Sequence, residues 1–244
     1  MDNSISLNQE WQNALESSIY KHARKCRLSS KLKDAIPDGI ANVDAYLNTS
    51  PKVAWIGKEP YDEVDESREP LIGGWSLTEG FLTNKTWSTR TWQRVIYTMY
   101  SLRTGYPYKE LGYIHDYPEM GDVMQSIAWI NLSKMPGGTT SGDSKFILEY
   151  QKYWKSIVME QLVVYNPDVI IFCNTLDACF SDFFPEGKEV DESVWYSEKE
   201  CFIDVYKKGR QLLLNAYHPG RPMSSKKEEF YVDSLVKIIR RFFP

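Results

Sequence analysis

The fold of this chain is decided by an apolar run that ends in a cluster of polar residues, Val53-Ala54-Trp55-Ile56-Gly57-Lys58-Glu59-Pro60-Tyr61-Asp62-Glu63. A short apolar run cut off by glycine predicts a buried strand, and in an open α/β sheet ligands bind at the carboxyl end of such a strand. Pro60 fixes its own backbone and favours an extended conformation at Glu59. We therefore expect Glu59 to project from a stiff corner, as a catalytic carboxylate requires.

Composition favours one α/β domain with elaborations. The chain has 244 residues, 42% of them hydrophobic, which is enough to bury a sizeable core. A net charge of −4 gives no overall attraction to nucleic acid or to an anionic membrane, so any such contact needs a local patch. No apolar run approaches the roughly 20 residues that span a bilayer, and the first residues lack the features of a signal peptide. We expect a cytoplasmic monomer that makes no membrane contact.

The cysteine pattern predicts neither a metal centre nor a cofactor. The four cysteines are widely spread and never form a Cys-x-x-Cys pair, which argues against zinc and against an iron–sulfur cluster. Buried, reduced thiols are the expected state of Cys26, Cys173, Cys179 and Cys201.

Further apolar runs predict three more buried strands with helices between them. The strands are expected within Ser126–Leu132, Pro167–Asn174 and Gln211–Ala216, the last forming a hairpin with Cys201–Tyr206. Residues 186–200 are expected to be irregular. Helices are expected in two segments of Leu7–Leu47, in Trp87–Leu102, Ser144–Tyr165 and Leu176–Phe184, and from a capping box formed by Ser225 and Glu228. The expected fold is a three-layer α/β/α sandwich with a mostly parallel four-stranded central sheet.

Three of these strands end in residues that carry chemistry. The first strand leads to Glu59, the second to Asn131 and the strand after the hairpin turn to His218. If the strands are parallel neighbours, the three groups converge on one edge of the sheet. A carboxylate, an amide and an imidazole form a coherent set for recognising a heterocycle and cleaving a bond to it.

These strand ends resemble the motifs of the uracil-DNA glycosylase superfamily. The run from Gly57 to Tyr61 resembles the first motif, which reads Gly-Gln-Asp-Pro-Tyr in one branch, and His218-Pro219-Gly220 resembles the second, His-Pro-Ser. The residues around Asn131 are similar to the strand end that supplies an asparagine to read uracil. The resemblance implies a uracil-DNA glycosylase-like α/β domain over residues 49–244, with residues 1–48 as an N-terminal helical extension packed on the core.

The resemblance also implies an activity, a partner and a set of site residues. The superfamily hydrolyses the N-glycosidic bond of a base that has been flipped out of the DNA stack, which is a base-excision step of DNA repair. Glu59 and His218 would be catalytic. The base would be bound by Asn131, Tyr61, Lys58, Trp75 and Phe81, and phosphate by Gly220, Arg221, Ser224, Thr139 and Thr140. The loop that carries the two threonines is also compatible with a plain turn before a helix capped by Asp143.

Departures from the family pattern keep other functions open. Glu59 is one methylene longer than the family's aspartate, Lys58 replaces a glutamine, and Gly220 replaces a serine. These changes favour a rival hypothesis: a catalytically inactive superfamily member that binds a nucleobase, nucleotide or nucleic acid. A third hypothesis is an N-glycoside hydrolase that acts on free nucleosides. The residues leave open which base is bound and whether the DNA is single- or double-stranded.

Overall fold

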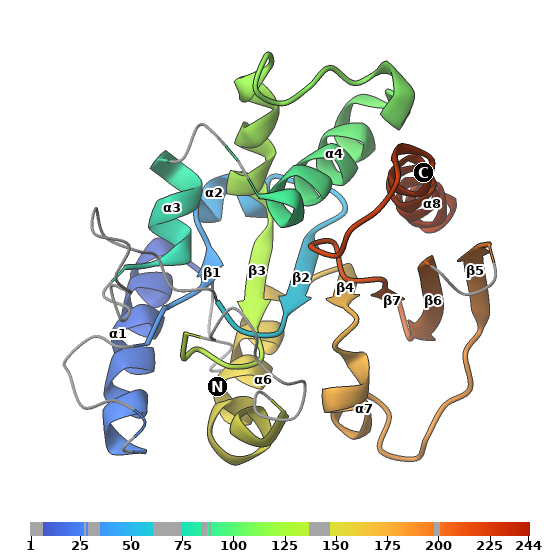
Figure 1. The fold of residues 1–244 in the computed structure, drawn as a ribbon. Coiled ribbons are helices and arrows are strands. Elements are labelled where there is room, and N and C mark those ends of the chain that lie inside the picture. The colour runs from blue at the N-terminus through green and yellow to red at the C-terminus, as the bar shows by residue number, and fades with distance from the viewer. Residues whose placement is uncertain are drawn as a thin grey trace.

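The computed structural model describes residues 7–26, 28, 35–60, 75–83, 87, 89–136, 147–197 and 201–244. Within these residues the chain has an α/β fold in which one sheet lies between helices (Figure 1). Three residues of the predicted site, Tyr61, Thr139 and Thr140, lie outside the described residues.

The described strands form one seven-stranded sheet in the order β1-β3-β2-β4-β7-β6-β5. The four middle strands, β3, β2, β4 and β7, run parallel to one another. They are the four strands expected from the sequence, and they are buried almost throughout, which explains their continuous apolar runs. The bounds are β1 Gly39–Ile40, β2 Val53–Gly57, β3 Ala128–Asn131, β4 Val169–Cys173, β5 Glu192–Tyr196, β6 Cys201–Lys208 and β7 Gln211–Ala216.

The expected four-stranded, mostly parallel sheet is wrong, because the sheet is larger and mixed. β1 pairs antiparallel with β3 at one side, and β6 and β5 continue antiparallel from β7 at the other. β1 has two residues, too few to show a periodicity. β5 lies in the segment expected to be irregular, and because none of its side chains is buried it lacks an apolar alternation. The expected hairpin of β6 with β7 is confirmed.

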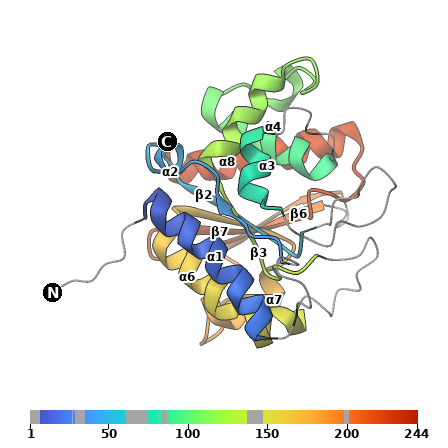
Figure 2. The ribbon, with the colours of Figure 1, turned by 90° about the vertical axis from the view of Figure 1, so that its left-hand side faces the viewer.

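The two faces of the sheet carry separate apolar cores. On β2, Val53 and Trp55 belong to one core and Ala54 and Ile56 to the other, as the alternation of a strand requires. Figure 2 shows α3, α4 and α8 on one side of the sheet and α1, α6 and α7 on the other. The first core is covered by α3 Leu77–Thr83, α4 Arg90–Thr104, the 3₁₀ helix η2 Pro118–Ser126 and α8 Ser225–Phe242. The second is covered by α1 Gln9–Lys25, α2 Val43–Leu47, the π-helical turn η3 Tyr150–Trp154, α6 Lys155–Tyr165 and α7 Leu176–Phe183. A short 3₁₀ helix, η1 Tyr108–Glu110, follows α4.

The N-cap of α8 lies one residue before the predicted one. Ser224 is the N-cap, and its Oγ accepts the backbone N–H of Lys227 over 3.4 Å. The predicted capping box of Ser225 with Glu228 is therefore wrong, because two consecutive serines precede the helix and the first of them caps it. Glu228 pairs instead with Arg94 of α4, at 3.3 Å.

Candidate functional site

The carboxyl ends of the parallel strands bring three predicted site residues to one edge of the sheet. Glu59 follows β2, Asn131 ends β3 and His218 follows β7. β2 and β3 lie side by side in Figure 1, with Gly57 and Asn131 in register. β4 separates β2 from β7, so those two strand ends lie roughly 10 Å apart, at about 4.8 Å per strand spacing. A ligand that contacts both Glu59 and His218 must therefore bridge two strand spacings.

The side chain of Asn131 is buried and held in one orientation. Nε1 of Trp129 donates to Oδ1 of Asn131 over 3.1 Å. Because an indole nitrogen only donates, the amide oxygen must face it. Gly57 makes the necessary room, since a β carbon there would lie 2.5 Å from Oδ1 of Asn131. The amide nitrogen, Nδ2, is buried and has no hydrogen-bond partner within the described part of the chain.

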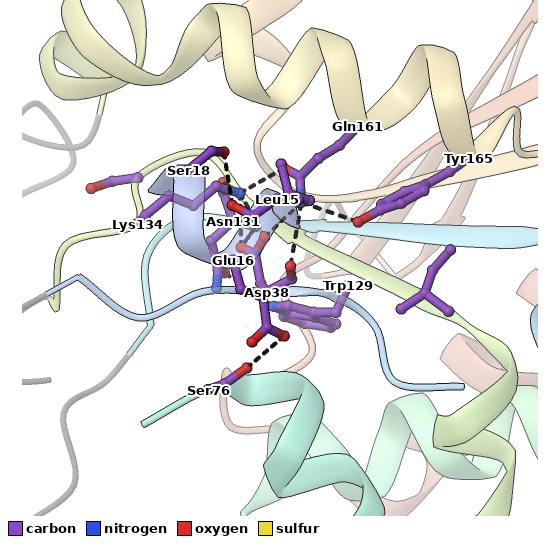
Figure 3. Close-up of polar contacts among 12 residues, drawn as sticks. Leu15, Glu16, Ser18, Asp38, Ser76, Trp129, Asn131, Lys134, Gln161 and Tyr165 are labelled. Atoms are coloured by element: carbon purple, nitrogen blue, oxygen red, sulfur yellow. Dashed lines mark hydrogen bonds and ion pairs between the residues drawn. The ribbon is translucent and has the colours of Figure 1, made fainter. Parts of the chain in front are cut away.

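A fully buried ion pair holds the backbone of Asn131. Oδ2 of Asp38 accepts the backbone N–H of Asn131 at 2.6 Å, and Nζ of Lys134 donates to the Asn131 carbonyl oxygen at 2.8 Å. Nζ also donates to both carboxylate oxygens of Asp38, at 2.7 and 2.8 Å. Figure 3 shows these side chains converging near the end of β3. Burial lowers the pKa of the Lys134 ammonium, and the Asp38 carboxylate opposes that shift.

The ion pair belongs to a network that reaches α6 and α1. Gln161 of α6 accepts from Lys134 at 2.9 Å and donates to Oδ1 of Asp38 at 3.0 Å. On the next turn of α6, the hydroxyl of Tyr165 donates to Gln12 of α1 over 2.7 Å. These residues satisfy one another's polar atoms in the interior, as buried polar groups require. Residues before β2, which the family resemblance does not cover, thus support the end of β3.

The ring of His218 is oriented by the turn that follows it. The backbone N–H of Gly220 donates to Nδ1 of His218 over 3.0 Å, and the N–H of Arg221 donates to the His218 carbonyl oxygen over 3.1 Å. Because Nδ1 accepts a hydrogen bond, it carries no proton, so the ring proton is on Nε2. His218 is therefore arranged as a neutral imidazole that donates through Nε2.

Arg94 of α4 holds the same turn from within the core. Its guanidinium is only 3% exposed. Nη1 donates to the carbonyl oxygens of Pro219 and Arg221, the latter at 2.6 Å, and Nη2 pairs with Glu228 of α8. These bonds tie the residues after β7 to two helices and fix where His218 can lie.

Aromatic side chains gather on the face of the sheet that carries Asn131. Phe81 packs edge-on against Trp92 with ring centroids 5.1 Å apart, and Trp92 packs against Trp129 at 4.6 Å. Phe81 is buried by these neighbours, whereas Trp75, the other predicted stacking residue, is half-buried. Nε1 of Trp75 is buried and has no hydrogen-bond partner among the described residues. Both predicted aromatic residues belong to the core that the Asn131 side chain adjoins.

The remaining predicted residues lie at two places. Lys58 is half-buried beside Glu59, and its carbonyl oxygen accepts the N–H of Ser133 at 2.9 Å. Gly220, Arg221 and Ser224 lie between β7 and α8, with the side chains of Arg221 and Ser224 exposed. The N–H of Gly220 is taken by His218, and Oγ of Ser224 caps α8. The exposed guanidinium of Arg221 is the cationic group of this set.

Sequence reasoning assigned no role to several residues that build the site. Asp38 was expected only to mark a break between helices, and Lys134 and Arg94 received no role. Asn174 follows β4, between the ends of β2 and β7, and has a left-handed backbone with φ of 56°. Such a conformation in a residue other than glycine is uncommon and calls attention to its position. The available signal was weak, because charged residues far apart in sequence give no hint that they pair in the interior.

The described residues include no group of three or more His, Cys, Asp or Glu side chains that could hold a metal ion. None of the helices in the described ranges is both long and apolar enough to cross a membrane. Comparison of the chain with models of known protein families and with curated proteins finds no match.

Proposed function

We propose that this protein hydrolyses the N-glycosidic bond of uracil or another damaged base in DNA. The observation that carries the proposal is the gathering of Glu59, Asn131 and His218 at the carboxyl edge of the parallel strands. Ligands of open α/β sheets bind at that edge. The resemblance of the same three positions to the motifs of the uracil-DNA glycosylase superfamily supplies the reaction.

The orientation of His218 supports its role toward the leaving base. When the bond from C1′ of the sugar to the base nitrogen breaks, the electron pair goes to the base, and negative charge develops on a base carbonyl oxygen. A neutral imidazole with its proton on Nε2 donates a hydrogen bond to that oxygen without having to ionise. The base is then protonated from solvent.

Glu59 acts on the sugar side of the same bond. Its carboxylate stabilises the positive charge that develops at C1′ and orients a water molecule toward that carbon. The water oxygen forms the new bond to C1′, and the water proton passes to the carboxylate. Asn131 hydrogen-bonds the edge of the base and keeps it between the two catalytic residues.

The test is release of uracil from a labelled single-stranded oligonucleotide that contains one uracil. Alkali cleaves the strand at the abasic site, and low salt keeps the phosphate contacts strong. We expect cleavage by the native protein. Glu59→Gln and His218→Ala should each lower the rate about 100-fold or more, as loss of a group that acts in the transition state does.

Matched substitutions far from the proposed site serve as controls. Glu110→Gln in η1 and His115→Ala in the connection to η2 remove the same chemical groups at exposed positions between α4 and β3. Both should retain the native rate. No strand cleavage by the native protein, with single- or double-stranded substrate, would contradict the proposed activity.

The rival function is binding of a nucleobase or nucleotide without cleavage. It is favoured by the engagement of Gly220, whose N–H is taken by His218, and by the longer side chain at Glu59. Catalysis tolerates misplaced groups poorly, whereas binding tolerates them better. Retained binding of the oligonucleotide or of uracil, with no base release, would favour this function. Turnover of free nucleosides without DNA would favour a nucleoside hydrolase.

A further inference from the structure

We propose that Asn131 is a preset hydrogen-bond donor, oriented by Trp129, and that the ligand presents a carbonyl oxygen to Nδ2 of Asn131. Trp129 is then a positioning residue that determines which ligand edge the site accepts. The identity of the ligand as a nucleobase rests on the proposed function, whereas the orientation of Asn131 rests on its own contacts.

Three of the four polar atoms of Asn131 are already used. Asp38 accepts its backbone N–H, Lys134 donates to its carbonyl oxygen, and Trp129 donates to Oδ1. Only Nδ2 is without a hydrogen-bond partner in the described ranges. A buried donor without an acceptor is unfavourable, and a ligand that supplies the acceptor removes that penalty on binding.

The indole of Trp129 prevents the amide of Asn131 from reversing. A reversed amide would place its NH₂ group against the indole N–H, so two donors would face each other in the interior. The indole itself cannot turn away readily, because Trp92 packs against it at 4.6 Å and Trp55 stacks on it at 6.5 Å, both between ring centroids. The ion pair of Asp38 and Lys134 fixes the backbone to which the amide is attached.

This arrangement discriminates between two pyrimidines of nearly equal size. Uracil carries a carbonyl oxygen at the position where cytosine carries an amino group. A fixed amide donor pairs with the carbonyl and opposes the amino group, and a polar mismatch in a buried site discriminates more strongly than a difference in size. A freely turning amide would serve either base.

The test compares Trp129→Phe with Trp55→Phe in equilibrium titrations of the full chain with free uracil and free cytosine. The two tryptophans stack on each other on neighbouring strands, and each substitution removes an indole while keeping an aromatic ring. Nε1 of Trp55 has no hydrogen-bond partner among the described residues, so Trp55→Phe is the matched control. We expect the native protein and Trp55→Phe to prefer uracil at least about tenfold, and Trp129→Phe to lose most of that preference.

A second measurement needs no substitution in the core. Uracil should shift the side-chain NH₂ resonances of Asn131 in nitrogen-15 spectra of the native protein and slow the solvent exchange of those protons. Three outcomes would overturn the inference: Trp129→Phe with an undiminished preference, Asn131 resonances that do not respond to bound uracil, or no uracil binding by the native protein. Uracil binding in the expected manner without base release from DNA would contradict only the proposed function.

Discussion

Gly220 approaches Thr91 of α4 so closely that a β carbon at Gly220 would lie 2.6 Å from Oγ1 of Thr91. The same carbon would lie 3.0 Å from Cε1 of His218. Position 220 is therefore closed to larger residues, including the serine that stands there in the family motif. The departure from the motif has a steric cause in the packing of this turn against α4.

Substitution Gly220→Ala should accordingly destabilise the protein by about 1–3 kcal/mol, the usual effect of overpacking. Urea denaturation measures the change. The double variant Gly220→Ala with Thr91→Ala should recover part of it, because the closest contact is then removed. As a control, Gly80→Ala in α3 meets nothing within 4 Å and should not destabilise. A Gly220→Ala protein as stable as the native one would contradict the tight turn.

The buried guanidinium of Arg94 should be essential for stability. Arg94→Met leaves two carbonyl oxygens and the Glu228 carboxylate without their donor, and loss of one member of a buried pair typically costs about 3–5 kcal/mol. Arg90→Met, at the exposed start of α4, should change the free energy of unfolding by less than about 0.5 kcal/mol. The double variant Arg94→Met with Glu228→Gln should lose less than the sum of the single losses. Additive losses in urea denaturation would exclude a coupled pair.

The central strands could be predicted from the sequence because burial on both faces leaves a continuous apolar run. The run that ends at Gly57 and the run that ends at Asn131 are neighbouring parallel strands in the structure. Their polar ends needed no contact information, since parallel strands place their carboxyl ends at one edge. β1 and β5 could not be predicted, because one is too short to show a pattern and the other has no buried side chains.

The support of the site could not be predicted, because it depends on contacts between distant residues. Asp38 and Lys134 are each ordinary surface residues in a sequence, yet both side chains are fully buried against each other. The position of Gly57 beside Asn131 and the acceptance of an indole N–H by Oδ1 depend on strand register. A single sequence does not specify which two strands become neighbours.

The thiols should differ sharply in reactivity. Cys173, Cys179 and Cys201 are buried, whereas Cys26 is partly exposed. Burial raises the pKa of the Cys201 thiol to about 11, and it also raises the pKa values of the Cys173 and Cys179 thiols. We expect one thiol to react quickly with a disulfide reagent at pH 8 and all four to react in urea. Cys26→Ser should abolish the fast phase, and a second fast thiol in the native protein would contradict this burial.

The same raised pKa values predict a loss of stability at alkaline pH. An unfolded thiol loses its proton near pH 8.5, whereas the folded Cys201 thiol keeps it to about pH 11. The folded state thus binds more protons in this window, so the free energy of unfolding falls as pH rises through it. Urea denaturation at pH 8 and pH 10 measures the fall, which Cys201→Ala should reduce. An equal fall in that variant would assign the effect to other groups.

The ion pair of Asp38 and Lys134 should be strongly coupled in stability. Lys134→Met leaves the Asp38 carboxylate buried without its cation and should destabilise by about 3–5 kcal/mol. Adding Asp38→Asn removes the uncompensated charge while keeping an oxygen that can accept the Asn131 N–H, so the double variant should be more stable than Lys134→Met alone. Lys188→Met breaks the exposed pair with Asp191, at 3.2 Å, and should change stability by less than about 1 kcal/mol. If Lys134→Met were as mild as Lys188→Met, the buried pair would not be what holds the end of β3.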